Sequence, residues 1–446
     1  MSDELLEYIN GNHISPLKLL ELTSEMNTVD IAEAFDELGR DKVVQMFRLL
    51  PKSLAADVFA YLIPEKQQII IEALTDDEAG KIINELFVDD AVDFVEEMPA
   101  SVVKRVLRYA SEDKRRLINQ LLQYPEDSAG SIMTTEFVDL KEDMTVGEAF
   151  DYIRATGVNK ETIYTCYVIK RDRELIGVVT VKTLFLAEPA DRIGDIMDIN
   201  PISAHTTDDQ EAVANLFSRY GLLSLPVVDK ENRLVGIVTV DDIVQVIEDE
   251  TTEDVEIMAA LTPSEVPYMK TGPIRHTRNR FLWLLFLMLS ATITAAIIAS
   301  FEEAVSVLAV LVAFIPMLMN TGGSAGCQCS ALIIRGLALG EIYTADILRV
   351  LWKEIRVGLL CGTALAIVNF IRVFLMNGGD YMLGATVSIS LLATIVISKF
   401  TGCLLPIAAK KLRLDPAIMS APLITTIVDG ASLLVYFSVA VVILKI

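Results

Sequence analysis

The sequence predicts a multidomain protein: an α-helical N-terminal superhelix, two tandem βαββα domains, a long connecting helix and a transmembrane domain of five helices. Short helical segments recur at intervals of 11 to 13 residues, one β-α-β-β-α pattern occurs twice, and five apolar segments fill the last third. The expected boundaries are 1–128 for the acidic helical domain, 129–190 and 191–246 for the repeated domains, 247–275 for the connecting helix and 276–446 for the transmembrane domain.

Negative charge is concentrated in the part that precedes the apolar segments. The 446 residues include 38 Lys and Arg against 61 Asp and Glu, but from Phe281 onward these numbers are 10 and 8. Residues 1–280 therefore carry a net charge of −25 and the rest about +2. Such a surface repels nucleic acid and attracts cations, so no nucleic-acid partner is expected. Acidity that only aids solubility is the simpler alternative.

Cysteine usage and the N-terminus both favour a cytosolic soluble part. Of the five cysteines, Cys327 and Cys329 form a C-x-C pair, and no pair has metal-finger spacing. We interpret the pair as small residues that allow close helix packing, without a disulfide framework. The N-terminus is acidic and lacks an apolar core, so no signal peptide is expected.

Residues 1 to about 125 have the pattern of short stacked helices. Most segments open with Pro, Thr or Ser, which favour a helix start, and each is too short to bury its own apolar face. The junctions are Leu50-Pro51, Ile63-Pro64, Leu74-Thr75, Phe87-Val88, Met98-Pro99 and Ala110-Ser111. Asp57, Asp89, Asp90 and Asp93 fall on these helices, and Asp89 and Asp93 are one helical turn apart. Taken singly, they are ordinary solvated charges.

The middle of the chain contains two copies of one unit, Ser131 to Glu188 and Ile193 to Glu250. The second copy predicts a helix at Asp209–Tyr220, strands at Leu225–Val228 and Leu234–Val240, and a closing helix. Its sequence LPVVD…LVGIVTVDDI resembles cystathionine-beta-synthase (CBS) domains. Tandem pairs of such domains generally act as regulatory sensors.

The CBS resemblance implies adenine nucleotides, ATP among them, as candidate regulators. Tyr167 could supply the aromatic residue of a nucleotide pocket. The sequence departs from the pattern at Lys182-Thr183, where an Arg-Asp pair is common, and at Leu222, where an aromatic can occur. Nucleotide binding is therefore left open.

The closing helix of the second copy continues into an acidic segment. Seven carboxylates fall within fourteen residues that contain no Lys or Arg: Asp241, Asp242, Glu248, Asp249, Glu250, Glu253 and Asp254. Like charges at i,i+4 spacing repel one another on a helix, so cations are expected nearby. The basic residues Arg275, Arg278 and Arg280 then mark the cytosolic edge of the membrane segment.

Five apolar spans follow the acidic segment, and the charges between them predict their orientation. The spans are 281–300, 304–334, 357–376, 381–409 and 417–444. Basic residues gather at 275–280, 349–356 and 410–413, whereas Glu302, Glu303 and Asp380 occupy the other loops. By the positive-inside rule, the N-terminal domains lie in the cytosol and the C-terminus lies outside.

Asp429 is the only charged residue between Ala417 and Leu444. An Asp at the centre of a membrane helix costs about 2.5 to 3.5 kcal/mol, so it should face a bundle interior or a water-filled path. The plainer alternative is a buried Asp bonded to a neighbouring hydroxyl or amide. Because no intramembrane base stands out as its partner, we expect Asp429 to attract a cation.

The second span contains Pro316 and three glycines, Gly322, Gly323 and Gly326. Helix breakers at membrane depth can free backbone carbonyls that line a polar path. The alternative is a seam of small residues between packed helices, and the two can coexist.

Two motifs in the membrane domain resemble the MgtE family of bacterial magnesium channels: NTGGSAGCQCSALIIRGLALGEI and LDPAIMSAPLITTIVDG. The resemblance covers essentially the whole chain. It implies a homodimer in the lipid of the inner membrane, with a pore lined by the second and fifth spans. It also implies that Asp429 and the backbone carbonyl near Thr425 hold the permeating Mg²⁺, with Ala421, Thr426 and Asn320 as weaker candidates for the pore wall. Ser324 and Cys327 depart from the family pattern.

The same resemblance implies regulatory Mg²⁺ sites that hold the pore closed when cytosolic Mg²⁺ is high. The matching residues are Asp57, Asp89 and Asp93 in the helical domain, Asp242, Glu250, Glu253 and Asp254 along the connecting helix, and, less firmly, Asp209 and Glu211. Gln245 and Gly221 stand where some relatives have acids, so fewer ions are expected here.

The alternatives to a channel are a coupled secondary transporter and a membrane enzyme or receptor. A secondary transporter that couples a divalent cation to Na⁺ or H⁺ would have similar spans, so the sequence does not separate it from a channel. A membrane enzyme or receptor with CBS domains is disfavoured. The chain has no P-loop or Ser/His/Asp set, and none of its three histidines stands beside a nucleophile. The chain is therefore not expected to be an enzyme.

Overall fold

The computed structural model describes residues 8, 16–264, 268–269, 271–301, 309–419 and 421–445. These residues form two units, 1–247 and 248–446, which we describe separately. Glu302 and Glu303, on which part of the predicted orientation rests, lie outside the described residues.

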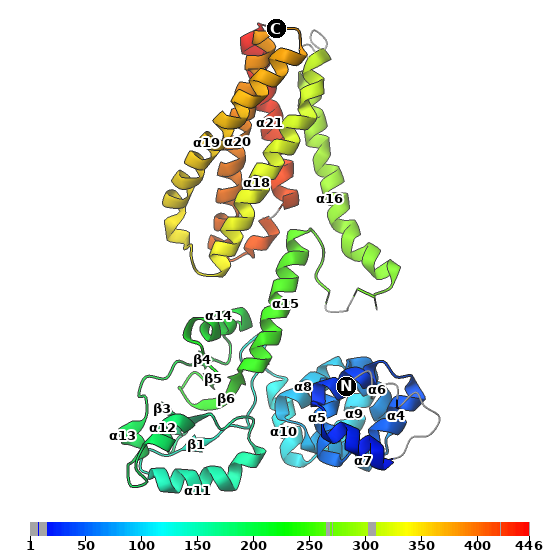
Figure 1. Cartoon of the computed structure of the whole chain (residues 1–446), viewed down its shortest axis with the longest axis vertical. Coiled ribbons are helices and arrows are strands. Elements are labelled where there is room, and N and C mark those ends of the chain that lie inside the picture. The colour runs from blue at the N-terminus through cyan, green and yellow to red at the C-terminus, as the bar shows by residue number, and fades with distance from the viewer. Residues whose placement is uncertain are drawn as a thin grey trace. The chain divides into compact units, whose positions relative to one another are not determined.

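The first unit begins with a stack of short helices (Figure 1). They are α2 (Pro16–Ser24), α3 (Thr28–Asp36), α4 (Arg40–Phe47), α5 (Lys52–Tyr61), α6 (Pro64–Ala73), α7 (Asp76–Glu85), α8 (Val88–Glu97), α9 (Ala100–Tyr109) and α10 (Glu112–Leu121). Helices α5 to α10 begin at the predicted junctions. The local reasons are visible: Pro64 occupies the first turn of α6, and Thr75 and Glu78 form a capping box on α7.

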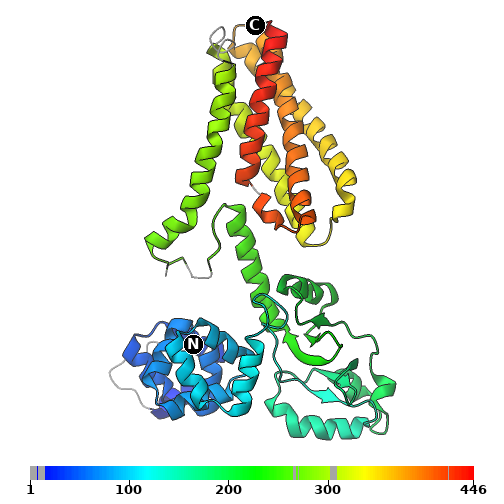
Figure 2. The same cartoon turned by 180° about the vertical axis from the view of Figure 1, so that it is seen from behind.

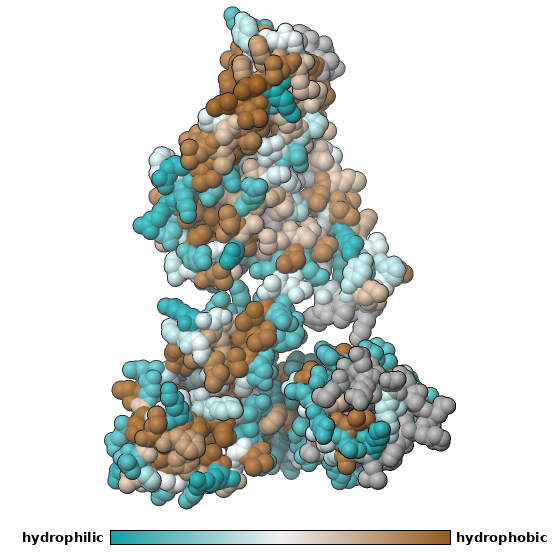
Figure 3. All heavy atoms as spheres, viewed as in Figure 1, coloured by the Kyte–Doolittle hydropathy of each residue, from teal (hydrophilic) through white to brown (hydrophobic). Residues whose placement is uncertain are grey.

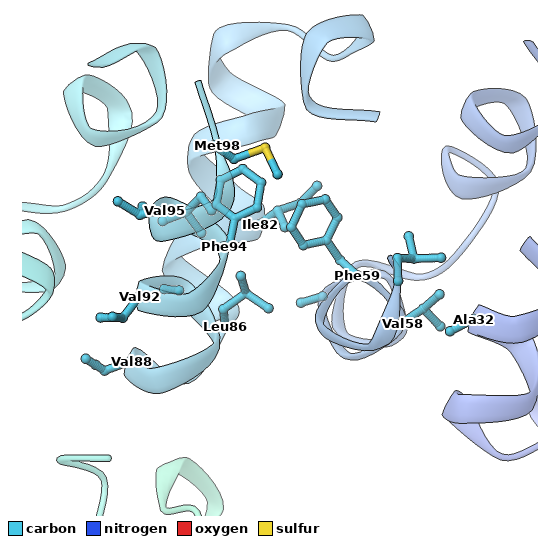
Figure 4. Close-up of a cluster of buried hydrophobic side chains, with 14 of the residues drawn as sticks. Ala32, Val58, Phe59, Ile82, Leu86, Val88, Val92, Phe94, Val95 and Met98 are labelled. Atoms are coloured by element: carbon cyan, nitrogen blue, oxygen red, sulfur yellow. The ribbon is translucent and has the colours of Figure 1, made fainter. Parts of the chain in front are cut away.

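Each short helix packs against the second helix along the chain, as α3 does on α5 and α7 on α9, which produces the superhelix. The apolar faces meet in a continuous core. At its centre the ring of Phe59 on α5 meets that of Phe94 on α8 edge to face, with centroids 5.3 Å apart (Figure 4). The remaining face of α8 is therefore left for its acidic residues.

Two CBS domains complete the first unit, and each has the predicted three-stranded sheet. The strands are β1 (Asp139–Leu140), β2 (Thr165–Ile169) and β3 (Leu175–Thr180), and then β4 (Ala204–His205), β5 (Ser224–Val228) and β6 (Leu234–Thr239). In each sheet the first strand is parallel to the second, which pairs antiparallel with the third. The helices are α11 (Val146–Thr156), α12 (Val181–Leu186), α13 (Ile193–Ile196) and α14 (Gln210–Tyr220), with the short η1 (Gly157–Asn159).

Helix α15 (Val240–Met258) closes the second CBS domain and continues through the acidic segment. It ends before the predicted connecting helix of 247–275 does. Ala260 adopts φ +56°, and the amide of Leu261 donates to the carbonyl of Glu256 at 2.9 Å, the geometry of a Schellman helix end. Pro263 then disfavours helical backbone at Thr262.

In the described part of the second unit, five helices are long and apolar enough to cross a membrane. They are α16 (Pro273–Ser300), α18 (Ile315–Ala338), α19 (Ile347–Met376), α20 (Tyr381–Lys411) and α21 (Ala421–Leu444), with 3-10 turns η2 (Ala309–Phe314), η3 (Thr344–Asp346) and η4 (Pro416–Met419) between them. Large apolar side chains such as Leu360, Val368 and Leu375 on α19 are exposed, as lipid contact requires. Figure 3 shows hydrophobic residues spread over the visible surface of these helices.

The glycines of the second span form a packing seam. Helix α18 is unbroken from Ile315 to Ala338, so the expectation that these glycines free carbonyls is wrong within this helix. A Cβ atom on Gly322 would lie 2.6 Å from Cγ2 of Thr394 on α20, and one on Gly326 would lie 2.6 Å from Cγ2 of Ile424 on α21. The missing side chains let three helices approach closely, which is the alternative raised by the sequence.

Two basic residues within the spans, Lys399 and Arg372, have polar side-chain partners in the protein. Lys399 on α20 is buried, and its Nζ lies 4.0 Å from a carboxylate oxygen of Glu354 on α19. Arg372 donates to the side-chain oxygen of Asn369 at 2.8 Å. The first contact joins α19 to α20, whereas the second lies within α19, whose Asn369 in turn donates to the hydroxyl of Ser388 on α20 at 3.2 Å.

The seam predicts that Gly402→Ala on α20 destabilises the membrane unit, because the added Cβ would collide with the carbonyl oxygen of Gly326 on α18. Overpacking of this kind costs about 1 to 3 kcal/mol. The thermal midpoint of the detergent-solubilised protein should fall. Gly358→Ala is the matched control, since its Cβ would lie 3.3 Å from Cγ of Lys399 and 3.5 Å from Cα of Val396, distances that need little or no adjustment. Equal midpoints for the two variants would argue against the seam.

Candidate metal sites

Asp429 lies on α21, one helical turn beyond Thr425, and both residues line a pocket of about 640 Å³ between α16 and α21. Asp429 is half-buried. Within the described residues, it forms no ion pair and no hydrogen bond, so the plainer reading of a carboxylate bonded to a neighbouring hydroxyl finds no support. The hydroxyls of Thr425 and Thr426 instead donate to the carbonyl of Pro422, at 3.0 and 2.9 Å. The carboxylate is therefore available to a cation.

Helix α18 sets the position of the Asp429 helix through its small residues. A Cβ on Gly323 would lie 2.9 Å from Cγ2 of Thr425, so glycine is needed for α18 to pack beside this turn. Cys327 donates its thiol to the carbonyl of Ala421 at 3.8 Å, where α21 begins. The exposed polar residues Asn320 and Ser324 follow one another at i,i+4 spacing on the outer face of α18, followed by Gln328.

The first unit brings together acidic side chains from distant parts of the sequence. Asp89, Asp90 and Asp93 project from α8, whose Val88, Ala91, Val92 and Val95 are buried in the core. The charges of Asp242, at the start of α15, and of Glu161, in the first CBS domain, reach this cluster and raise the pKa values of its members. Of the predicted residues, the structure thus groups Asp89, Asp93 and Asp242.

Burial is the main cause of the pKa shifts in this cluster, and repulsion between carboxylates adds to it. Burial and then the charge of Asp90 raise the pKa of Asp93 to about 7. Burial also raises the pKa values of Asp90 and Asp242 to about 6. For Asp89 the pKa lies well above its ordinary value for the same reasons. The folded unit therefore holds negative charge at a cost near neutral pH.

Glu161 is a member of this cluster that the sequence did not reveal. Its pKa is raised to about 8, first by burial and then by the charge of Asp241. Its Oε2 atom is buried and has no hydrogen-bond partner among the described residues. No sequence signal marks Glu161, because it lies in an irregular segment about 70 residues from α8.

The cluster is not a preformed metal cage. Within the described ranges, no three His, Cys, Asp or Glu side chains converge closely enough to hold one ion together. Mg²⁺ usually retains several waters and binds through one or two carboxylates, so such an arrangement suits a hydrated ion.

The other predicted regulatory acids have more local surroundings. Asp57 on α5 has a pKa raised by burial and then by Glu85, and its charge reaches Asp90. Asp209 caps α14 by accepting from the amide of Glu211 at 2.9 Å. Glu250, Glu253 and Asp254 lie on α15, in the part that belongs to the second unit.

Tyr167 lies in the core between the two CBS sheets. It is fully buried, its hydroxyl is 2.7 Å from that of Ser224, and its ring packs edge to face on Phe137. Both faces of the ring are therefore covered by protein in this arrangement. A role for Tyr167 with a nucleotide stays a prediction.

Comparison with known proteins decides the family. Residues 26–127 match the MgtE intracellular N domain, residues 129–189 and 193–249 match CBS domains, and residues 315–439 match the MgtE family of divalent cation transporters. The chain is 36% identical over 431 residues to magnesium transporter MgtE of Thermus thermophilus, which covers 96% of this chain and 95% of the relative.

The chain belongs to the MgtE family.

Magnesium transporter MgtE of Bacillus subtilis is 34% identical to this chain, and the match covers 93% of this chain and 92% of that relative. The solved cytosolic domain of the Mg²⁺ channel MgtE in complex with ATP is 35% identical, with a TM-score of 0.52, and covers 55% of this chain and 100% of that one. The predicted fold class and family are confirmed. So is the expectation that this MgtE-family chain is not an enzyme, since its relatives are transporters.

The acidic cluster predicts a pH-dependent stability of the first unit. Unfolded Asp releases its proton near pH 4, whereas folded Asp93 does so at about pH 7. The folded state binds more protons between these values, so its stability falls as pH rises through this window. In urea unfolding of residues 16–258, Asp93→Asn should raise the midpoint at pH 8 and change it less at pH 5.

The control for this prediction is Glu65→Gln, which neutralises an exposed acid at the start of α6. Its midpoint should follow that of the unsubstituted fragment at both pH values. A midpoint for Asp93→Asn that shifts equally at pH 5 and pH 8 would contradict the raised pKa.

Proposed function

We propose that this chain is a Mg²⁺-selective channel that acts as a homodimer, carries Mg²⁺ into the cell across the cytoplasmic membrane, and is closed by cytosolic Mg²⁺. One observation carries the proposal. In the transmembrane unit, Asp429 lines a pocket and has no protein partner among the described residues. A half-buried negative charge within a membrane helix is stabilised when a cation occupies the path.

The chemistry of the pocket suits Mg²⁺ as the transported ion. Mg²⁺ demands near-octahedral oxygen ligands and loses water reluctantly, so one or two carboxylates that hold a hydrated ion are expected. Asp429 supplies a carboxylate, and the backbone carbonyl near Thr425 is a second candidate ligand. Binding through so few protein groups remains weak enough for release, as conduction requires.

The outer face of α18 supports a homodimer. Asn320, Ser324 and Gln328 are exposed in a single chain, although they lie on a helix that crosses the membrane. Polar residues facing lipid are costly, and a second copy packed on this face would cover them. The same symmetry would bring two copies of Asp429 to one ion path.

Gating follows from linkage between Mg²⁺ and the acidic residues of the cytosolic part. Burial, together with repulsion by Asp90 and Asp242, raises the pKa values of Asp89 and Asp93, and these raised values report the cost of their negative charge. Mg²⁺ bound there would offset the repulsion and favour the compact arrangement. Asp57, Asp209, Glu211, Glu250, Glu253 and Asp254 are further candidate ligands. Since binding favours one state, high cytosolic Mg²⁺ shifts the population toward a closed pore.

ATP is included as a candidate regulator. The support is a relative whose cytosolic domain was solved in complex with ATP. Because Tyr167 is buried, a nucleotide would contact other residues of the CBS pair. The proposed orientation places the CBS pair in the cytosol and the C-terminus outside the cell, in line with the basic residues at 275–280 and 410–413.

The pore assignment predicts that Asp429→Asn abolishes Mg²⁺ uptake in cells that lack other importers, because the ion loses its only charged ligand in α21. Uptake should fall at least about tenfold while the protein is still folded and inserted. Asp380→Asn is the control, since it is the same change in a helix cap that Asn can also form. Normal growth of the Asp429→Asn strain on low Mg²⁺ would contradict the assignment of Asp429 to the pore.

The gating assignment predicts that the triple substitution Asp89→Asn, Asp93→Asn and Asp242→Asn leaves Mg²⁺ currents that persist at high cytosolic Mg²⁺. Without the three carboxylates, Mg²⁺ no longer favours the compact state. Patch-clamp recording from inside-out membrane patches measures this directly. A triple substitution of exposed acids, Glu65→Gln, Asp113→Asn and Asp151→Asn, is the control. If Mg²⁺ inhibits the Asp89/Asp93/Asp242 variant as it does the unsubstituted protein, the cluster has no part in gating.

A further inference from the structure

Helix α16 faces the Asp429 pocket with two hydroxyl side chains. Ser290 and Thr294 are one helical turn apart and lie on the face of α16 that lines the pocket. The rest of that face is apolar: Leu287, Ala291, Ala295 and Ile298. The pocket wall opposite Asp429 is thus polar only at these two positions.

The rotation of α16 is fixed by its contacts with α21. The ring of Phe301 stacks on that of Phe437, with centroids 5.1 Å apart and planes 17° apart. Ile297 on α16 lies against Gly430, the residue after Asp429. A Cβ atom added to Gly430 would lie 3.5 Å from Cδ1 of Ile297. In both views the C-terminal end of α16 lies close to α21, and the two helices diverge toward the N-terminal end of α16 (Figures 1 and 2).

The hydroxyl groups of the pocket differ in what they bond. Ser290 donates to the carbonyl of Leu287 at 2.8 Å, and Thr425 and Thr426 both donate to that of Pro422. In the described part of the chain, the hydroxyl of Thr294 has no such partner. Thr294 and Asp429 thus line one pocket, and neither has a protein hydrogen-bond partner among the described residues. Such a hydroxyl is available to bind water.

We propose that Thr294 is a selectivity residue of the ion path, whose hydroxyl contacts the water shell of the cation held at Asp429. This inference rests on the proposed function and extends the path to α16. Mg²⁺ keeps most of its waters, and each bound water is a strong hydrogen-bond donor. The lone pairs of Thr294 accept from that shell, while Asp429 supplies the charge. Ser290, one turn away, keeps its acceptor lone pairs while it donates to Leu287, so it can provide a second contact.

The test compares three variants of the full-length protein. Thr294→Val removes the hydroxyl and keeps the shape. Thr294→Ser keeps the hydroxyl. Thr292→Val makes the same change on the exposed face of α16, where Thr292 donates to the carbonyl of Leu289 at 2.6 Å. Two readouts apply to each: the KM for Mg²⁺ uptake, and the block of uptake by hexaamminecobalt(III). This ion does not exchange its ligands, and it presents N–H donors where hydrated Mg²⁺ presents waters.

The expected result is that Thr294→Val raises the KM and the half-blocking concentration by about two- to tenfold, the range that one hydrogen bond supplies. The maximal rate should change less. Thr292→Val should behave as the unsubstituted protein does, whereas Thr294→Ser, which keeps the hydroxyl, should restore most of the change in KM and in half-blocking concentration that Thr294→Val produces. An unchanged KM in Thr294→Val, or a block that is the same in all variants, overturns the inference while Mg²⁺ uptake itself stands. Absence of Mg²⁺ uptake by the unsubstituted protein overturns the proposed function instead.

Discussion

Carboxylates that are crowded together or held within a membrane helix are the constraint on which both units depend. Asp429 sits within a membrane helix with no protein partner among the described residues, and Asp89, Asp93 and Asp242 are brought together in the first unit. Each arrangement costs free energy that the surrounding packing must offset. In the membrane, the seam of glycines on α18 holds α21 in place. In the first unit, the buried apolar face of α8 holds the acidic residues of that helix in place.

The same physical chemistry connects selection and regulation in the proposed channel. A small divalent cation relieves the cost in both places, but the consequences differ. In this proposal the ion at Asp429 would be held through few protein groups and pass on, whereas at the acidic cluster it would stabilise one arrangement of the domains. Neither place needs a rigid cage, in agreement with the absence of a converging triad of ligands in the described residues. Hydration of the ion is thus part of recognition.

Local signals in the sequence predicted most of the fold, and tertiary proximity accounts for what was missed. Helices α5 to α7, α9 and α10 begin where Pro, Thr or Ser marks their starts, and apolar length predicted the five membrane helices. Glu161 was missed because only folding brings a loop of the first CBS domain to α8. The role of Gly322 and Gly326 depends on Thr394 and Ile424 from other helices, so the sequence left two alternatives. The end of α15 at Met258 relies on Ala260 in a conformation that glycine usually supplies.

The most direct measurement is Mg²⁺ flux through the purified full-length protein in proteoliposomes, with free Mg²⁺ set separately on each side and no gradient of Na⁺ or pH. Mg²⁺ should flow down its own gradient, and the flux should fall steeply as Mg²⁺ rises on the side of the CBS domains. A flux that requires a Na⁺ or H⁺ gradient would contradict the channel. A flux that ignores Mg²⁺ on that side would contradict its regulation by the acidic cluster.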